Sequence, residues 1–219
     1  MEILPIELFG VHVDVAFPQP LTYQAAKLED FANAVCHPQT GLSIRPDQLR
    51  LRRLDDLFDY EVKANFFGDN GTLTRTAERA KVGIRNARTQ SDWNIIQQTL
   101  TRFYTLMQFD EKSLTHLSAH AHARFKSLEE RDQWLGQFSH NALVQKPAAL
   151  GYVKIPDWEK EVRVLIEHSN VMPNAIFIAW DTQFQNEQEW DTFLGSLPSM
   201  MENSVNYFEL GFEPFKERV

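Results

Sequence analysis

The stretch Thr115-His-Leu-Ser-Ala-His-Ala-His-Ala-Arg-Phe125 decides the fold, because apolar and polar side chains alternate along it without a break. Successive residues of a strand point to opposite faces, so one face is apolar and the other polar. The apolar face carries Leu117, Ala119, Ala121, Ala123 and Phe125, and the polar face carries His116, Ser118, His120, His122 and Arg124. The small alanines suit close packing beneath a helix. We expect that helix over residues 128–139, because Ser127-Leu-Glu-Glu130 is a capping-box sequence.

The first half of the chain contains a matching strand at residues 9–17. Val11, Val13 and Val15 share one face of it, and His12 and Asp14 share the other. A helix is expected from Thr22 until Pro38 and Gly41 end it. Strands are then expected over residues 49–52, 60–66 and roughly 73–85, with a reversal at 68–71 in which Asn70-Gly71 suits a tight turn, and a long helix is expected over 91–107.

The second half repeats this order of elements. Strands are expected over residues 151–155, 161–167 and 175–180, and a last helix begins near Asn186. We therefore predict an α+β fold of tandem duplicated β-α-β-β(-β)-α units, residues 1–110 and 111–219. Each unit has an antiparallel sheet with helices packed on one face, and the two are related by a pseudo-two-fold axis. This order is similar to that of the duplicated saddle of the TATA-binding protein family. No motif of that family is present, so the likeness implies architecture and no function.

Composition favours an ordinary soluble globular protein and excludes several classes. The chain has 219 residues, 43% of them hydrophobic, and a formal net charge of −8. The second half is the acidic one, with 10 basic and 16 acidic residues against 12 and 14 in residues 1–110. No apolar run approaches the length of a membrane span, and the first residues lack the basic region of a signal peptide, so we expect a cytoplasmic protein without a membrane partner. The lone Cys36 has no partner for an internal disulfide.

The histidine strand is a candidate metal site. His120 and His122 share a face at a separation of about 6.5–7 Å, which allows two imidazoles to reach one metal ion. His116, Glu161 and Glu167 are possible further ligands. The alternative interpretation is a solvated sheet face or an interface between the halves.

Basic residues gather in the first half, with ten between residues 45 and 88 against seven acidic ones. Such a face can hold phosphate groups or an acidic protein partner. The alternative interpretation is an open face whose charges form salt bridges with one another. Four of the basic residues share one parity of the strand expected over 73–85, and two lie on the strand expected over 49–52. These candidate binding residues are Arg75, Arg79, Lys81 and Arg85, with Arg50 and Arg52.

The sequence predicts no catalytic residue and no cofactor. It contains no nucleotide-binding glycine loop, no Cys-x-x-Cys pair and no His-Glu-x-x-His helix. His12 and Asp14 are therefore interpreted as binding residues, as is Trp158, which follows a proline-led turn. The sequence favours a non-enzymatic binding protein, such as an adaptor, inhibitor or immunity-like subunit, with a protein partner. A nucleic-acid binder using the arginine-rich hairpin and a metal-dependent enzyme using the histidine strand stay open as alternatives.

Overall fold

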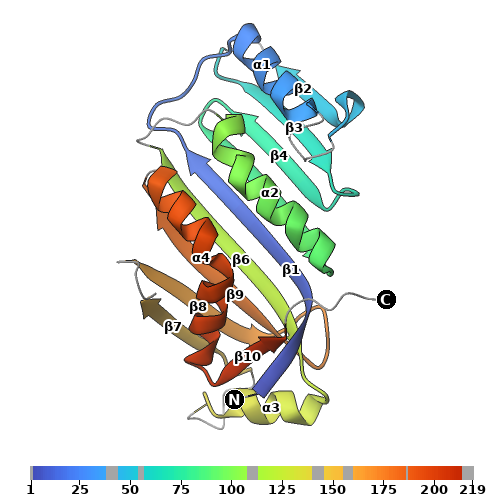
Figure 1. The fold of residues 1–219 in the computed structure, drawn as a ribbon, viewed down its shortest axis with the longest axis vertical. Helices are drawn as coiled ribbons and strands as arrows, with labels where there is room; N and C mark the ends of the chain where they lie inside the picture. Colours follow the sequence, from blue (N-terminus) through green and yellow to red (C-terminus); the bar gives the residue numbers. More distant parts are fainter. Residues whose placement is uncertain are drawn as a thin grey trace.

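The computed structural model describes residues 2–37, 44–53, 57–107, 113–139, 146–154, 160–185 and 187–213, and these form an α+β fold (Figure 1). The strands of the first half are β1 (Glu2–Ala16), β2 (Leu49–Arg53), β3 (Tyr60–Phe66), β4 (Gly71–Thr76) and β5 (Arg79–Ala87). Those of the second half are β6 (Leu114–Arg124), β7 (Ala149–Lys154), β8 (Glu161–His168), β9 (Ala175–Phe184) and β10 (Leu210–Glu213). The helices are α1 (Ala25–Cys36), α2 (Gln90–Met107), α3 (Leu128–Gly136) and α4 (Glu187–Asn206), with a short 3-10 helix, η2 (Pro46–Gln48).

All ten strands belong to one sheet that runs through both halves of the chain. Its order is β2-β3-β4-β5-β1-β6-β9-β8-β7, and neighbouring strands along this order are antiparallel. β10 pairs in parallel with the first residues of β1. The two opening strands predicted from their alternation, β1 and β6, therefore lie side by side at the centre, with Val13 opposite Leu117.

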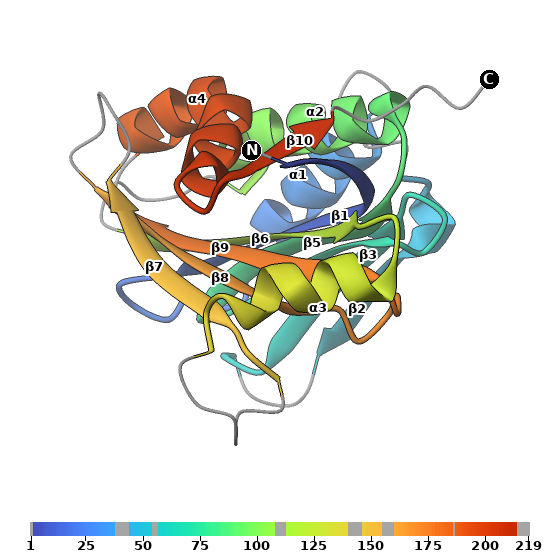
Figure 2. The ribbon, with the colours of Figure 1, turned by 90° about the horizontal axis from the view of Figure 1, so that it is seen from below.

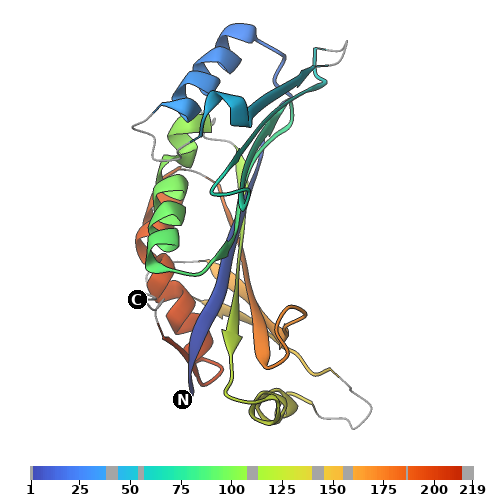
Figure 3. The same cartoon turned by 90° about the vertical axis from the view of Figure 1, so that its right-hand side faces the viewer.

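Three helices form a layer on one face of the sheet. Figures 2 and 3 show α1, α2 and α4 on the same side, and α3 beyond the ends of the central strands. The expectation of helices on one face is thus correct for three of the four. The alanines of β6 lie on the face that α2 and α4 cover, and the helix that follows β6 does not lie over them.

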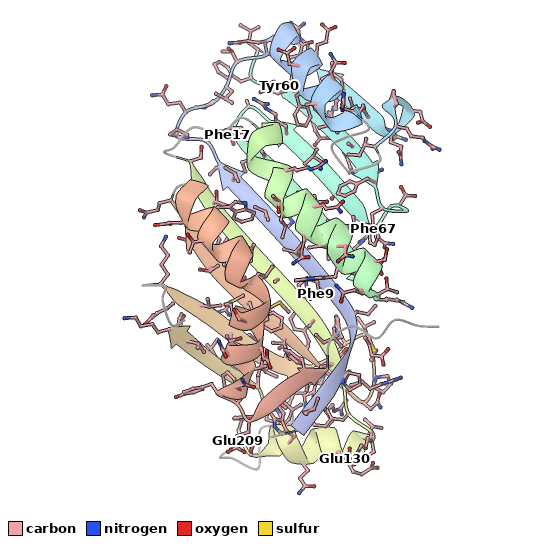
Figure 4. All side chains as sticks on the ribbon, viewed as in Figure 1. Phe9, Phe17, Tyr60, Phe67, Glu130 and Glu209 are labelled. Carbon is pink, nitrogen blue, oxygen red and sulfur yellow. The ribbon has the colours of Figure 1, made fainter. Side chains whose placement is uncertain are left out.

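The core lies between the sheet and this helix layer. Phe9 of β1 is fully buried and meets Trp93 of α2 edge to face, with ring centroids 5.1 Å apart (Figure 4). The indole N–H of Trp190 in α4 donates to the carbonyl of Leu100 in α2 at 3.3 Å. This bond gives the buried donor an acceptor and ties the two long helices together.

Three local expectations are wrong. The strand expected over 73–85 is two strands, because the chain turns at Ala77 and Glu78 between β4 and β5. In the reversal after β3, the positive φ angles occur at Phe67, Gly68 and Asp69 and not at the Asn70-Gly71 pair. β1 also begins at Glu2, seven residues before the expected start, because bulges near Ile6 and Phe9 interrupt its alternation without ending its pairing.

Candidate functional site: the uncovered face of the sheet

The face opposite the helices is concave, since the sheet bends away from the helix layer at both ends (Figure 3). Side chains on this uncovered face form rows that cross the strands. The central row, from one edge to the other, is Asn65, Thr72, Gly83, His12, Ser118, Asp181, Arg163 and Tyr152. The charged row beside it is Arg50, Lys63, Thr74, Lys81, Asp14, His116 and Gln183.

Asp14 holds two cations at the centre of the uncovered face. Its Oδ2 lies 3.2 Å from Arg79 Nη1 and 3.2 Å from Lys81 Nζ. The pairing of β1 with β5 sets both contacts, because Lys81 is directly opposite Asp14 and Arg79 is opposite Ala16. The other carboxylate oxygen, Oδ1, is buried without a hydrogen-bond partner.

Asp181 plays the corresponding part in the second half. Its Oδ2 accepts a hydrogen bond from Arg163 Nη1 at 2.8 Å, and its Oδ1 lies 3.8 Å from His116 Nε2. His116 in turn is opposite Asp14 across the β1–β6 pair. A series of basic side chains and carboxylates, with the His116 imidazole between the two carboxylates, therefore crosses from β5 to β8.

The histidines of β6 share the uncovered face, as predicted, and an aromatic side chain packs against two of them. The ring centroids of His120 and His122 are 6.2 Å apart. The ring centroid of Phe177 lies 5.8 Å from that of His120 and 5.3 Å from that of His122. His122 Nδ1 forms a 2.9 Å hydrogen bond with Ser169 Oγ. Within the described ranges, no three His, Cys, Asp or Glu side chains are grouped as ligands for a metal ion. Metal binding by His116, His120 and His122 stays a prediction.

Burial lowers the pKa of three histidines on this face below their ordinary value of 6.5. For His120 and His122 the main cause is the loss of solvent, and the charge of His122 lowers the pKa of His120 further. For His12 the main cause is again desolvation within the concave face, partly offset by the nearby Asp14 carboxylate. Neutral imidazoles are therefore favoured at pH 7.

A glycine makes room for one of these rings. A Cβ atom on Gly10 would lie 2.3 Å from Cε1 of His120 and 3.0 Å from the carbonyl oxygen of Ile84. The absence of a side chain at Gly10 thus allows the imidazole to lie flat across β1, in the middle of the face.

Most of the predicted basic residues lie on the uncovered face. Over β2 to β5 this face carries six basic side chains and one acidic one, Glu61. The six are Arg50, Arg52, Lys63, Arg79, Lys81 and Arg85. Arg75 was expected among them, and that expectation is wrong. The turn at residues 77–78 breaks the assumed parity, so Arg75 lies on the covered face with only 6% of its surface exposed.

The second half supplies residues that the sequence reasoning missed. Arg163 and Asp181 lie in the central row, and Leu150 and Tyr152 are exposed on the outer strand β7. The alternation of residues 161–167 was a usable signal for Arg163. No such signal pointed to Asp181, because the expected strand ended at residue 180. Trp158 lies outside the described residues.

A depression of about 680 Å³ lies over this half of the face. His116, Arg163, Asp181 and Tyr152 are among the residues that line it. Arg163 and Asp181 pair within it, and Lys160 pairs with Glu189 outside it. No nucleophile with an adjacent base is seen among its described residues.

No known protein family matches this chain, and a comparison of its sequence with curated proteins finds no relative. In the described part of the chain, no helix is long and apolar enough to cross a membrane.

Proposed function

We propose that the protein is a non-enzymatic binding protein whose uncovered sheet face engages the acidic surface of a protein partner. The observation that carries the proposal is the basic excess on this face, six side chains to one over β2 to β5, in a chain of net charge −8. Arg50 and Lys63 face each other across β2 and β3 and form no ion pair among the described residues. Basic groups without internal partners are available to an external carboxylate.

The far edge of the same face supports a protein partner. Tyr152 is 65% exposed and Leu150 is 56% exposed, and both lie on β7 at the end of rows that begin in the first half. Aromatic and aliphatic anchors within a polar surround are typical of protein interfaces. A partner that spans the concave face would contact basic groups at one end and these anchors at the other.

Affinity capture from the native cell with a set of matched variants tests the proposal. Wild-type protein and an Arg88→Glu control, which changes an exposed charge outside the sheet, are expected to retain the same partner. An Arg50→Glu/Lys63→Glu double variant and a Tyr152→Ala variant are expected to lose it. Identical retention by all four proteins would refute the proposal. If the variants lose the partner, binding measured with the purified components gives the affinity.

Nucleic acid is the second candidate, favoured by the same basic excess. A polyanionic backbone would follow the charged row from Arg50 through Lys63 to Lys81. Thr74 lies between Lys63 and Lys81 in this row. This candidate predicts that purified protein retains DNA or RNA at low salt and releases it steeply as salt rises. An absence of retention at low salt would exclude it.

We also propose that residues 1–110 and 111–219 are duplicated units related by a pseudo-two-fold axis. Supporting this, β1 and β6 open the two halves and pair at the centre of the sheet, with β5-β4-β3-β2 on one side and β9-β8-β7 on the other. The long helices α2 and α4 close the two halves and pack against each other. Significant similarity between alignments of the two halves in homologous chains would test the duplication, and its absence in a deep alignment would count against it.

A further inference from the structure

A small pocket on the covered side of the sheet lies between the start of α1 and the ends of β3 and β4. Its volume is about 180 Å³, room for about six water molecules at roughly 30 Å³ each. Backbone bonds hold the segment before α1 over it, from Leu21 N–H to the Ala77 carbonyl and from Tyr23 N–H to the Leu57 carbonyl. The pocket is lined by Pro20, Leu21, Thr22, Gln24, Leu28, Tyr60 and Arg75.

Arg75 brings a buried positive charge to this pocket. Its guanidinium lies 5.7 Å from the Phe31 ring and 6.0 Å from the Phe17 ring, and the Tyr60 phenol is close enough to interact with its charge. Its Nε is buried without a partner, and no carboxylate pairs with it in the described part of the chain. Figure 4 shows Phe17 and Tyr60 at this end of the sheet, beside α1.

The Tyr60 phenol does not neutralise the Arg75 guanidinium. Burial raises the pKa of Tyr60, although Arg75 partly opposes this shift, so the phenol stays protonated near neutral pH. Desolvation also lowers the pKa of Arg75, which reflects the cost of a buried cation without an anion. Among the described residues, the charge is therefore not compensated by a carboxylate.

The N-terminus of α1 adds a second positive feature at the same place. Gln24 precedes the helix and lines the pocket, its side chain makes no capping hydrogen bond, and the first turn carries no acidic residue. The first N–H groups of a helix have no acceptor within the helix, and the helix dipole favours an anion there.

We propose that this pocket binds a small oxyanion, the phosphate or carboxylate group of a small molecule. Arg75 supplies a fork of donors, the Tyr60 and Thr22 hydroxyls supply further polar contacts, and the first turn of α1 supplies backbone N–H groups. The site is separate from the uncovered face, because Arg75 lies on the opposite side of the sheet. Binding here would fasten α1 and the segment before it to the sheet.

Titration of the purified protein at constant ionic strength tests the proposal. Inorganic phosphate and acetate are the two probes, with chloride as the balancing ion. At a probe concentration roughly 100-fold above Kd, we expect the Tm to rise by about 5–10 °C and to continue rising with the logarithm of the probe concentration. Such a rise with one probe alone identifies which oxyanion the pocket takes. The absence of a rise in Tm with both probes in the wild-type protein overturns the proposal.

Two variants locate the effect. Arg75→Met removes the charge while keeping a long side chain, and it is expected to abolish the rise in Tm. The matched control is Arg53→Met, which removes an exposed guanidinium stacked 4.3 Å from the centre of the nearby Tyr23 ring, and it is expected to keep the rise. An equal rise in Arg75→Met places the anion elsewhere and refutes the site. If Arg75→Met does not fold, Thr22→Val, at the mouth of the pocket, must weaken binding at least several-fold, or the site is refuted.

Discussion

The two faces of the sheet use the same strands in opposite ways. On the covered face, β1 presents Phe9 and Val13 to the helices, both fully buried. On the uncovered face, the same strand presents His12 and Asp14, which lie among charges from β5 and β6. The period of two in a single strand thus separates a face that stabilises the fold from a face available for binding.

The placing of charge sharpens this contrast. On the uncovered face Asp14 meets Arg79 and Lys81, and Asp181 meets Arg163. On the covered face the buried Arg75 has no carboxylate beside it in the described residues. Paired, partly exposed charges change the free energy of unfolding little. An unpaired buried charge lowers it strongly unless a ligand or other interactions compensate for its desolvation.

Truncating an aromatic side chain on each face gives the largest expected difference. Phe9→Ala removes a fully buried ring and its edge-to-face contact with Trp93, so we expect a loss of about 3–5 kcal/mol in the free energy of unfolding. The matched change on the uncovered face is Phe177→Ala, where the ring is only partly buried, with an expected loss of about 1–2 kcal/mol. Urea denaturation measures both. Equal losses would show that the uncovered face is as important to stability as the core.

Much of this two-faced organisation could be predicted from the sequence. The alternation in residues 115–125 and 11–15 placed β6 and β1, and it assigned His12, Asp14 and the three histidines to the face away from the core. Local periodicity carries that information because each strand is amphipathic over several residues. It did not indicate that β1 and β6 pair, since pairing joins residues about a hundred positions apart.

The errors have local physical causes. Two residues of turn at Ala77 and Glu78 separate β4 from β5 without any glycine or proline, so the parity count ran through the turn and misplaced Arg75. The turn signal was also weak because Thr76, a residue type enriched in strands, accepts the backbone N–H bonds of Glu78 and Arg79 with its hydroxyl. The pocket beneath α1 could not be predicted from the sequence. It forms where Arg75, which was assigned to the wrong face, lies beside the start of α1, some fifty residues earlier in the chain.

The histidines of the uncovered face make the stability of the protein sensitive to pH. Their folded pKa values are lowered, so the unfolded chain takes up protons at about pH 6.5 while the folded chain resists. Stability is therefore complete above this pH and falls as the pH is lowered from about 6.5 through the folded pKa values. Urea denaturation at pH 7.5, 6 and 5 measures the fall, and a His120→Gln/His122→Gln variant should show a shallower one. A wild-type stability that stays flat over this range would contradict the assignment.

Removing one carboxylate tests the contrast at its smallest scale. Asp14→Asn breaks the two ion pairs to Arg79 and Lys81, whose cations are about half exposed, so we expect a loss of about 1 kcal/mol or less. The same change removes the charge that raises the pKa of His12, so that pKa should fall further in a histidine titration followed by NMR. Asp59→Asn, which changes an exposed carboxylate in the loop before β3, should leave the His12 titration where it is. An unchanged His12 pKa in Asp14→Asn would mean that the carboxylate interacts with Arg79 and Lys81 alone, and that the charges of the charged row do not affect the central row.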